Sequence, residues 1–209
     1  MKKIIKPKLS SYLDEAKLNE INVDTDKIEN QVFEGEKVNK TFKNVEINGC
    51  TFKNMDFSDS VLEDVDVIDC VFDSCDLSNM EINAKLFLRA VFLNCSLTGL
   101  NMIDSSIDNV IFEECNMRYS NFSCKKIKNV LFSSCNLESS RLFENTLNDV
   151  KIDGSNLSNA EIYKTNLNGI DLSNCTLDDI KTDIESIKGV TVDITGAINL
   201  SRMLGINIK

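Results

Sequence analysis

The sequence places an apolar residue at every fifth position. From Phe42 to Leu177, all 28 positions spaced by five residues are Phe, Leu, Ile, Val or Met. An α-helix turns about 100° per residue, so this spacing would wind apolar residues around a helix and build no buried face. A β-strand alternates with a period of two and does not match either. The spacing instead predicts short extended segments separated by corners and stacked into a solenoid.

Most of these positions are preceded, two residues earlier, by a second small or apolar residue. Residues 75–79 (CDLSN) and 155–159 (SNLSN) show the resulting unit most plainly. Units of the form A(D/N)LXX resemble those of the pentapeptide-repeat proteins, and the resemblance covers most of the chain. It implies an all-β fold, a right-handed quadrilateral β-helix in which four pentapeptides form one coil. Residues four pentapeptides apart should then stack from one coil to the next.

The repeat divides the chain into three parts. We expect an N-terminal arm over residues 1–10, the pentapeptide-repeat β-helix over residues 11–192 and a C-terminal capping or dimerisation segment over residues 193–209. The arm is basic and carries no repeat, so we expect it to be mobile or to form part of a cap. A short helix over residues 11–21, capped by Ser11, is an alternative to the first repeats.

The first repeats are less regular than the later ones. Their apolar positions are Leu13, Leu18, Val23, Ile28, Phe33 and Val38. The inward positions two residues earlier include the polar residues Asp26, Gln31 and Glu36, so these coils should be looser. Between Val38 and Phe42 the spacing shortens to four residues, which requires one tighter corner.

Stacking predicts columns of equivalent residues in the core. One column should form an aromatic ladder of Phe52, Phe72, Phe92, Phe112 and Phe132. We number the four sides of the coil, beginning with residues 40–44 and their equivalents, as faces 1, 2, 3 and 4. On face 2 the inward position holds Lys85, Lys125 and Asn145. Because an unpaired buried lysine is costly, we expect a bulge there or a side chain that escapes at a corner.

The sequence contains eight cysteines and no histidine. Seven cysteines occupy the inward position two residues before an apolar centre: Cys50, Cys70, Cys75, Cys95, Cys115, Cys135 and Cys175. Cysteine behaves there as a small apolar residue, and no CxxC pair accompanies it, so the pattern indicates packing. Cys124 falls at an outward or corner position and is predicted to be a reactive surface thiol. We expect neither a cofactor nor a bound metal.

Face 3 also carries apolar residues on its outward side. They form one column of Val71, Val91, Ile111 and Leu131. These side chains either ladder against one another across adjacent strands or form a contact patch. Both interpretations stay open, and the sequence favours the ladder.

The repeat fades at Thr182 and gives way to a C-terminal helical pattern. Ala197, Leu200, Met203 and Leu204 share one helical face, and Gly205 is a natural end for the helix. A helix of about nine residues is marginal on its own in water. We therefore expect this segment to close the last coil, to join two subunits, or to do both.

Several classes of protein find little support in the sequence. Histidine is absent, no glycine-rich phosphate loop occurs, and the carboxylates recur at the outward positions of the repeat, so we do not expect an enzyme. No apolar run approaches the roughly 18 residues of a membrane-spanning helix. The basic N-terminus has too short an apolar patch for a signal peptide. We therefore predict a cytoplasmic protein that does not contact membranes.

The chain is acidic, with a formal net charge of −10. Residues 41–180 contain 22 acidic and 11 basic residues. Faces 4 and 1 together hold 12 acids against 4 bases, whereas face 2 is balanced. Because faces 4 and 1 meet at an edge, negative charge should concentrate on one side of a rod. Ordinary acidic solubility is the alternative explanation.

Both ends of the repeat region resemble the quinolone-resistance (Qnr) branch of the pentapeptide-repeat family. The similar segments are residues 27–44 and the C-terminal GVTVDITGAINLSRMLGI, with Gly189-Val190 and Leu204-Gly205-Ile206 as the most characteristic pieces. This resemblance implies a homodimeric rod that mimics DNA, binds DNA gyrase and topoisomerase IV, and shields them from fluoroquinolones. Plasmid-borne members carry two loops for which the unbroken repeat leaves no room. The absence of these loops argues more strongly against drug protection than against topoisomerase binding.

The resemblance also implies particular site residues. The dimer junction would contain Leu200, Met203, Leu204 and Ile206. The surface that meets a topoisomerase, with no direct binding of nucleic acid, would consist of acids on faces 4 and 1: Asp56, Asp59, Glu63, Asp64, Asp76, Glu81, Asp104, Glu138, Glu144 and Glu161. The alternative function is a pentapeptide-repeat interaction scaffold with an unrelated protein partner.

Overall fold

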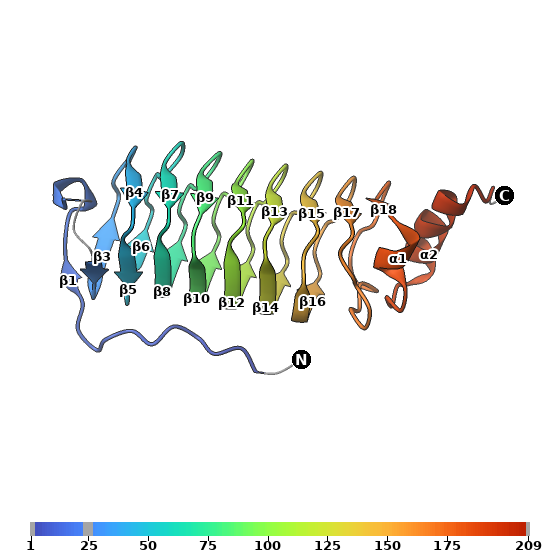
Figure 1. Ribbon diagram of the computed structural model, residues 1–209, viewed down its shortest axis with the longest axis horizontal. Helices are drawn as coiled ribbons and strands as arrows, with labels where there is room; N and C mark the ends of the chain where they lie inside the picture. The colour runs from blue at the N-terminus through green and yellow to red at the C-terminus, as the bar shows by residue number, and fades with distance from the viewer. Residues whose placement is uncertain (1–2, 23–26, 208–209) are drawn as a thin grey trace.

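The computed structural model describes residues 3–22 and 27–207, apart from the side chain of Leu204. The chain forms a right-handed, parallel quadrilateral β-helix of about eight coils with a short helix at its C-terminal end. Figure 1 shows the coils stacked along one axis, so the molecule is a rod. Val23 and Asp26 of the expected repeat lie outside the described residues.

Faces 2 and 3 form the larger of two parallel sheets. Phe92 pairs with Phe72 on one side and Phe112 on the other, so each central coil takes 20 residues. In the central coils a single long strand spans both faces. The strands are β1 (Asp14–Glu15), β2 (Lys27–Glu29), β3 (Gln31–Glu34), β5 (Glu46–Asn48), β6 (Thr51–Lys53), β8 (Asp66–Asp73), β10 (Leu86–Leu93), β12 (Ser106–Glu113), β14 (Lys126–Ser133) and β16 (Leu147–Asp153).

Face 1 forms the smaller sheet from short strands. They are β4 (Thr41–Lys43), β7 (Val61–Glu63), β9 (Glu81–Asn83), β11 (Asn101–Ile103), β13 (Asn121–Ser123), β15 (Arg141–Phe143), β17 (Glu161–Tyr163) and β18 (Lys181–Thr182). On face 4, single bridges such as that between Asp56 and Asp76 join successive coils. Side chains alternate between the two sides of each strand, which places the apolar centres of the repeat inside the coil.

One coil near the N-terminus is a residue shorter than those that follow. Phe33 pairs with Phe52, 19 residues later, whereas Phe52 pairs with Phe72, 20 residues later. This shorter coil confirms the tighter corner expected between Val38 and Phe42.

The aromatic ladder of the core is present. Consecutive rings stack with centroids 4.7–5.3 Å apart, and the ladder begins one coil earlier than expected. Its members are Phe33, Phe52, Phe72, Phe92, Phe112 and Phe132. At most corners the last residue of the pentapeptide has a positive φ, as at Asn54 (50°). Asn and Asp tolerate this left-handed conformation, which explains their frequency at that position.

Two corners of face 2 expel a lysine from the core. At each, the residue before the lysine, Ala84 or Cys124, turns inward and is buried, while Lys85 and Lys125 are exposed. The expected escape of these two side chains is confirmed. Asn145, at a third such corner, stays buried, and its side-chain oxygen accepts a hydrogen bond from the Cys124 N–H at 2.9 Å.

The prediction that Cys124 is a reactive surface thiol is wrong. Its side chain is only 2 % exposed, and burial raises the pKa of the thiol to about 12. The cause is the neighbouring Lys125, whose burial would carry a large desolvation cost, so the corner shifts by one residue. Cys175 is the one partly exposed cysteine, and the other seven are buried.

The helix considered over residues 11–21 does not form. After β1 the chain makes only one turn of 3-10 helix, Leu18–Glu20, in which Leu18 is buried. The carboxylate of Glu36 accepts hydrogen bonds from the backbone N–H groups of Leu18 and Asn19 at 2.8 and 3.0 Å. Glu36 therefore acts as the cap of this turn instead of breaking the first coil.

The C-terminal end is helical. It contains α1 (Ile184–Ile187), α2 (Ile194–Ser201) and a 3-10 turn, Arg202–Leu204. Asp183 and Asp193 cap the two helices by accepting hydrogen bonds from backbone N–H groups. Gly205 follows with a φ of 71°, which confirms it as the end of the helical segment.

The N-terminal arm lies along the side of the rod. The N–H of Ile5 donates to Oδ1 of Asn109, and the N–H of Lys8 donates to Oδ1 of Asp69, both at 2.8 Å. Figure 1 shows this blue segment running back beneath the central strands of the larger sheet. The structure thus places residues 3–10 against the coil, where the sequence predicted a mobile arm or part of a cap.

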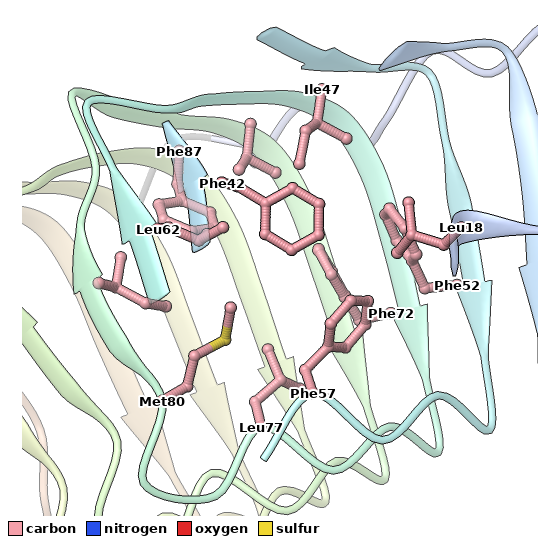
Figure 2. Close-up of a pocket in the computed structure, with 12 residues that line it drawn as sticks. Leu18, Phe42, Ile47, Phe52, Phe57, Leu62, Phe72, Leu77, Met80 and Phe87 are labelled. Atoms are coloured by element: carbon pink, nitrogen blue, oxygen red, sulfur yellow. The ribbon is translucent and has the colours of Figure 1, made fainter. Parts of the chain in front are cut away.

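The interior of the rod is filled by apolar side chains. Figure 2 shows Phe42, Phe52, Phe72 and Phe87 among the residues around a gap of about 20 Å³. Such a gap has room for little more than one water molecule. The functional surface must therefore lie on the outside of the coil.

Candidate functional site

The ten acids proposed for partner binding all lie at exposed or half-buried positions of faces 4 and 1. Asp64, Asp104 and Glu144 form one column, because each follows a strand of face 1 and takes a positive φ of 55–57°. All three are exposed. They are separated by two coils, which places them about 10 Å apart along the rod.

Half of the ten acids are neutralised by a basic residue on a neighbouring coil. The pairs are Asp56 with Lys37, Glu63 with Lys43, Glu138 with Arg118, Glu144 with Lys164, and Glu161 with Arg141 and Lys181, at distances of 2.6–3.3 Å. The hydrogen bond from Lys164 lowers the pKa of Glu144, and that from Lys181 lowers the pKa of Glu161. Glu144 and Glu161 therefore stay ionised, and the basic partners of the five acids weaken the negative potential of this surface.

The remaining five acids make no ion pair within the described part of the chain. They are Asp59, Asp64, Asp76, Glu81 and Asp104. All five lie in the N-terminal half of the edge between faces 4 and 1, interspersed with the paired Asp56 and Glu63. In the C-terminal half, Glu138, Glu144 and Glu161 are all paired. We call these five residues the uncompensated acidic patch. The sequence predicted the edge but not this division along it.

Face 1 also presents apolar side chains that the sequence analysis missed. Ile103 is 42 % exposed, and Phe143 and Tyr163 meet edge to face with ring centroids 5.5 Å apart. These residues line a shallow hollow together with Asp104 and Glu144. They occupy the outward position after the apolar centre, where other coils have polar residues such as Lys43 or Glu63. Apolar residues at this position could therefore have been recognised in the sequence as an exposed apolar surface.

The C-terminal residues proposed for a dimer junction differ in their surroundings. Leu200 packs partly against the core, Met203 is half-buried and Ile206 is 50 % exposed. The side chain of Leu204 lies outside the described residues. The large apolar side chains that α2 exposes are Ile194 and Ile198, at 82 % and 37 %. Their spacing of four residues was readable in the sequence as a second helical face.

Other kinds of site find no geometric basis in the described residues. No group of three Cys, Asp or Glu side chains there is arranged to hold a metal ion. No described helix has the length and apolar character needed to cross a membrane.

Two protein-family models match parts of the chain. A family model described as the pentapeptide repeat region matches residues 65–142, and a second, described as pentapeptide repeats (8 copies), matches residues 146–179. Together they cover just over half of the chain. No curated protein sequence matches it.

Several solved structures are similar to the chain. Full-length QnrB1, a plasmid-mediated fluoroquinolone resistance protein, is 23% identical, with 92% of this chain and 95% of that chain covered and a TM-score of 0.32. A trypsin-treated QnrB1 variant is 23% identical over 85% and 97%, with a TM-score of 0.38.

HetL is a pentapeptide repeat protein involved in heterocyst differentiation regulation in the cyanobacterium Nostoc. It is 13% identical over 77% of this chain and 83% of that chain, with a TM-score of 0.39. The two family models, the five-residue spacing and the four-sided coil agree. The chain therefore belongs to the pentapeptide-repeat family.

Proposed function

We propose that this protein is a non-enzymatic DNA mimic that binds a type II topoisomerase, DNA gyrase or topoisomerase IV. The observation that carries the proposal is the uncompensated acidic patch on one edge of a rigid rod. A topoisomerase binds DNA through a basic track, and an acidic edge complements such a track. The partner class comes from the resemblance to the Qnr branch, and protection from fluoroquinolones would follow if the bound rod displaces drug-stabilised DNA.

The charge is dilute compared with that of DNA. Seven coils at about 4.8 Å span roughly 34 Å, a length over which duplex DNA carries about 20 phosphate charges. Residues 41–180 carry 22 acids and 11 bases, a net charge of −11. The mimic would therefore depend on the shape of the rod as well as on its charge.

In this proposal the protein works as a homodimer joined through its C-terminal ends. Ile194 and Ile198 leave an apolar face on α2 that a second copy would cover. The junction would include Leu200, Met203, Leu204 and Ile206, with Ile194 and Ile198 added to it. Sedimentation of the full chain as a monomer at micromolar concentration would contradict this arrangement.

A second candidate function is an interaction scaffold for an unrelated protein. The exposed Ile103 and the Phe143–Tyr163 pair favour it, because apolar side chains on face 1 contribute no negative charge to a mimic of phosphates. A scaffold of this kind would bind its partner through that hollow, and duplex DNA would not compete with this binding.

The test compares two triple charge reversals in a binding assay with purified gyrase. The first changes Asp64, Asp104 and Glu144 to Lys on face 1. Lys164 takes a positive φ of 51° at an equivalent corner, so lysine is tolerated there. We expect binding to weaken by roughly tenfold or more, to fall steeply with salt and to compete with duplex DNA.

The matched control changes Glu113, Glu114 and Asp149 to Lys, which alters the net charge equally. These three residues are exposed on faces 2 and 3, away from the acidic edge. Asp69 is unsuitable as a control because it is buried beneath the arm. Equal losses from both triples, or no competition with DNA, would leave the scaffold as the better explanation.

A further inference from the structure

An apolar column on the outside of face 3 is buried, although it belongs to no part of the core. Val91 and Ile111 point outward from β10 and β12, yet they are only 9 % and 8 % exposed. Neither residue belongs to the cluster of side chains that fills the interior. Val71 and Leu131 continue the column at half-buried positions in register. Something on the outer surface must cover the middle of this column.

The N-terminal arm lies at the same place. It bonds to the corner between faces 2 and 3, only two residues before the outward column in each coil. The acceptors Asp69 and Asn109 are each 7 % exposed, so these bonds are partly buried. Ile4 and Pro7 of the arm are half-buried, whereas Ile5 and Leu9 are 52 % and 39 % exposed.

The spacing of the coil matches that of an extended peptide. Asp69 and Asn109 are two coils apart, about 9.6 Å. Ile5 and Lys8 are three residues apart, which spans about 9–10 Å in an extended or polyproline-like chain. Ile4 and Pro7 share the same separation of three residues. The corner column therefore holds a peptide backbone every third residue, and most side chains of that peptide stay free.

The corner column is a rigid, charged track. Arg89 donates two hydrogen bonds of 2.6 Å to the carboxylate of Asp69 and fixes its position. Burial raises the pKa of Asp69, but Arg89 and the Lys8 N–H outweigh it, and the pKa stays below its usual value. Asp69 is therefore a permanent acceptor at neutral pH.

The column also contains an acceptor that the described arm does not use. Asn129 lies one coil beyond Asn109 and is 7 % exposed. Its side-chain nitrogen donates to Asp108 at 2.9 Å, but its oxygen is buried and accepts no hydrogen bond among the described residues. This column therefore offers an extended segment one more backbone acceptor than residues 3–10 use.

We propose that the column Asp69, Arg89, Asn109 and Asn129, with the outward apolar column beside it, is a binding site for an extended, lysine-bearing peptide segment of a partner protein. Residues 3–9 occupy this site as an internal competitor. The site recognises backbone N–H groups and apolar side chains three residues apart, and the acidic chain favours a basic ligand. It is separate from the acidic edge of faces 4 and 1.

The test uses the full chain and a fluorescent peptide of residues 1–11 as the probe. Changing Ile4 and Pro7 to Asp should release the arm, because both side chains are half-buried and Asp69 repels added negative charge. Faster amide exchange at Ile5 and Lys8 reports the release. We expect the released variant to bind the peptide at least tenfold more tightly than the wild type, whose site is already occupied.

Two controls isolate the site. Changing Ile5 and Leu9 to Asp adds the same charge at exposed positions and should leave peptide binding as weak as in the wild type. Adding Asn109→Ala to the released variant removes one acceptor and should lose most of the gained affinity. A variant lacking residues 2–9 gives a second route to an open site, because every core side chain, beginning with Leu18, is retained.

Three outcomes would overturn the proposal. One is equal peptide binding by the wild type and the released variant. Another is absence of binding to both the released and the shortened variants while their circular dichroism stays native. The third is exchange of arms between two chains, seen as oligomers that the free peptide dissociates, which would assign the site to a second copy.

Discussion

The first coils and the central coils both carry polar residues at positions where the repeat requires an inward apolar side chain. The two regions accommodate these polar residues differently. In the central coils, Lys85 and Lys125 are expelled because Ala84 and Cys124, the residues before them, are small enough to turn inward instead. The first coils have no such substitute. There Gln31 follows Asn30, and its buried side-chain oxygen accepts no hydrogen bond from any described residue.

The difference teaches a rule about corners in this fold. A polar residue at the inward position leaves the core only when a small apolar residue precedes it. Asn145 supports the rule, because it follows the charged Glu144 and stays buried. Its side-chain nitrogen donates no hydrogen bond within the part of the chain that the structure describes. The inward position is thus decided by two neighbouring residues together.

The largest effect should come from breaking the ladder at its centre. Phe92 stacks between Phe72 and Phe112 and is 1 % exposed, so Phe92→Ala should lower the free energy of unfolding by about 3–5 kcal/mol. Phe33 stacks on one ring of the ladder at its irregular end, so Phe33→Ala should cost less. Urea unfolding followed by circular dichroism measures both. Equal losses would show that the two regions are equally tightly packed.

The sequence predicted what depends on the period alone. The cornered solenoid and the shorter corner after Val38 follow from the positions of the apolar residues. The four sides of the coil, on which the phenylalanine ladder depends, were implied by the resemblance to the pentapeptide-repeat proteins. The inward turn of Cys124 was missed because it depends on an exchange with Lys125. The ion pairs were missed although their signal was present, since Lys43 and Glu63 lie one full coil apart.

The docked arm could not have been predicted. Residues 3–10 carry no repeat, and their acceptors Asp69 and Asn109 lie 61 and 104 residues away from the donors in the sequence. Their pairing depends on the spacing of stacked coils, which exists only in the folded rod. The candidate acidic edge could be predicted from charge counts, but the distinction between its paired and unpaired acids required the positions of the basic side chains.

A pH experiment sharpens the comparison at the Cys124 corner. Burial raises the pKa of this thiol from 9.0 to about 12. Since the folded pKa is the higher one, the stabilisation is fully present below about pH 9 and is lost as the pH rises towards 12. Three pH units correspond to a loss of up to about 4 kcal/mol.

Cys124→Ala should remove this contribution, because alanine does not titrate and already fits the equivalent corner at residue 84. The stability difference between wild type and variant, measured near pH 8 and near pH 11, should shift in favour of the variant at the higher pH. Cys175→Ala, at a half-buried position, is the control and should shift less. A difference that does not change with pH would mean that the thiol is not buried.

A smaller effect should appear in the first coils. The buried side-chain oxygen of Gln31 has no hydrogen-bond partner among the described residues, whereas later coils place Val110 and Val130 in the same column. Gln31→Val should therefore raise the free energy of unfolding by about 1 kcal/mol. The same urea titration tests it, with the exposed Glu34→Val on the same strand as control. A loss of stability in Gln31→Val would show that the Gln31 side chain stabilises the fold despite its buried oxygen.

The smallest effect should come from Lys125. This lysine is exposed and makes no ion pair within the described residues, so Lys125→Ala should change stability by less than about 0.5 kcal/mol. Val65 occupies the equivalent inward position in an earlier coil, is 0 % exposed and follows the charged Asp64. Val65→Lys should therefore lower the free energy of unfolding several times more, because the charged Asp64 cannot replace it in the core without a desolvation cost. Equally small changes in the free energy of unfolding would show that a lysine can leave the core at any corner. The small residues Ala84 and Cys124 would then not be required for its escape.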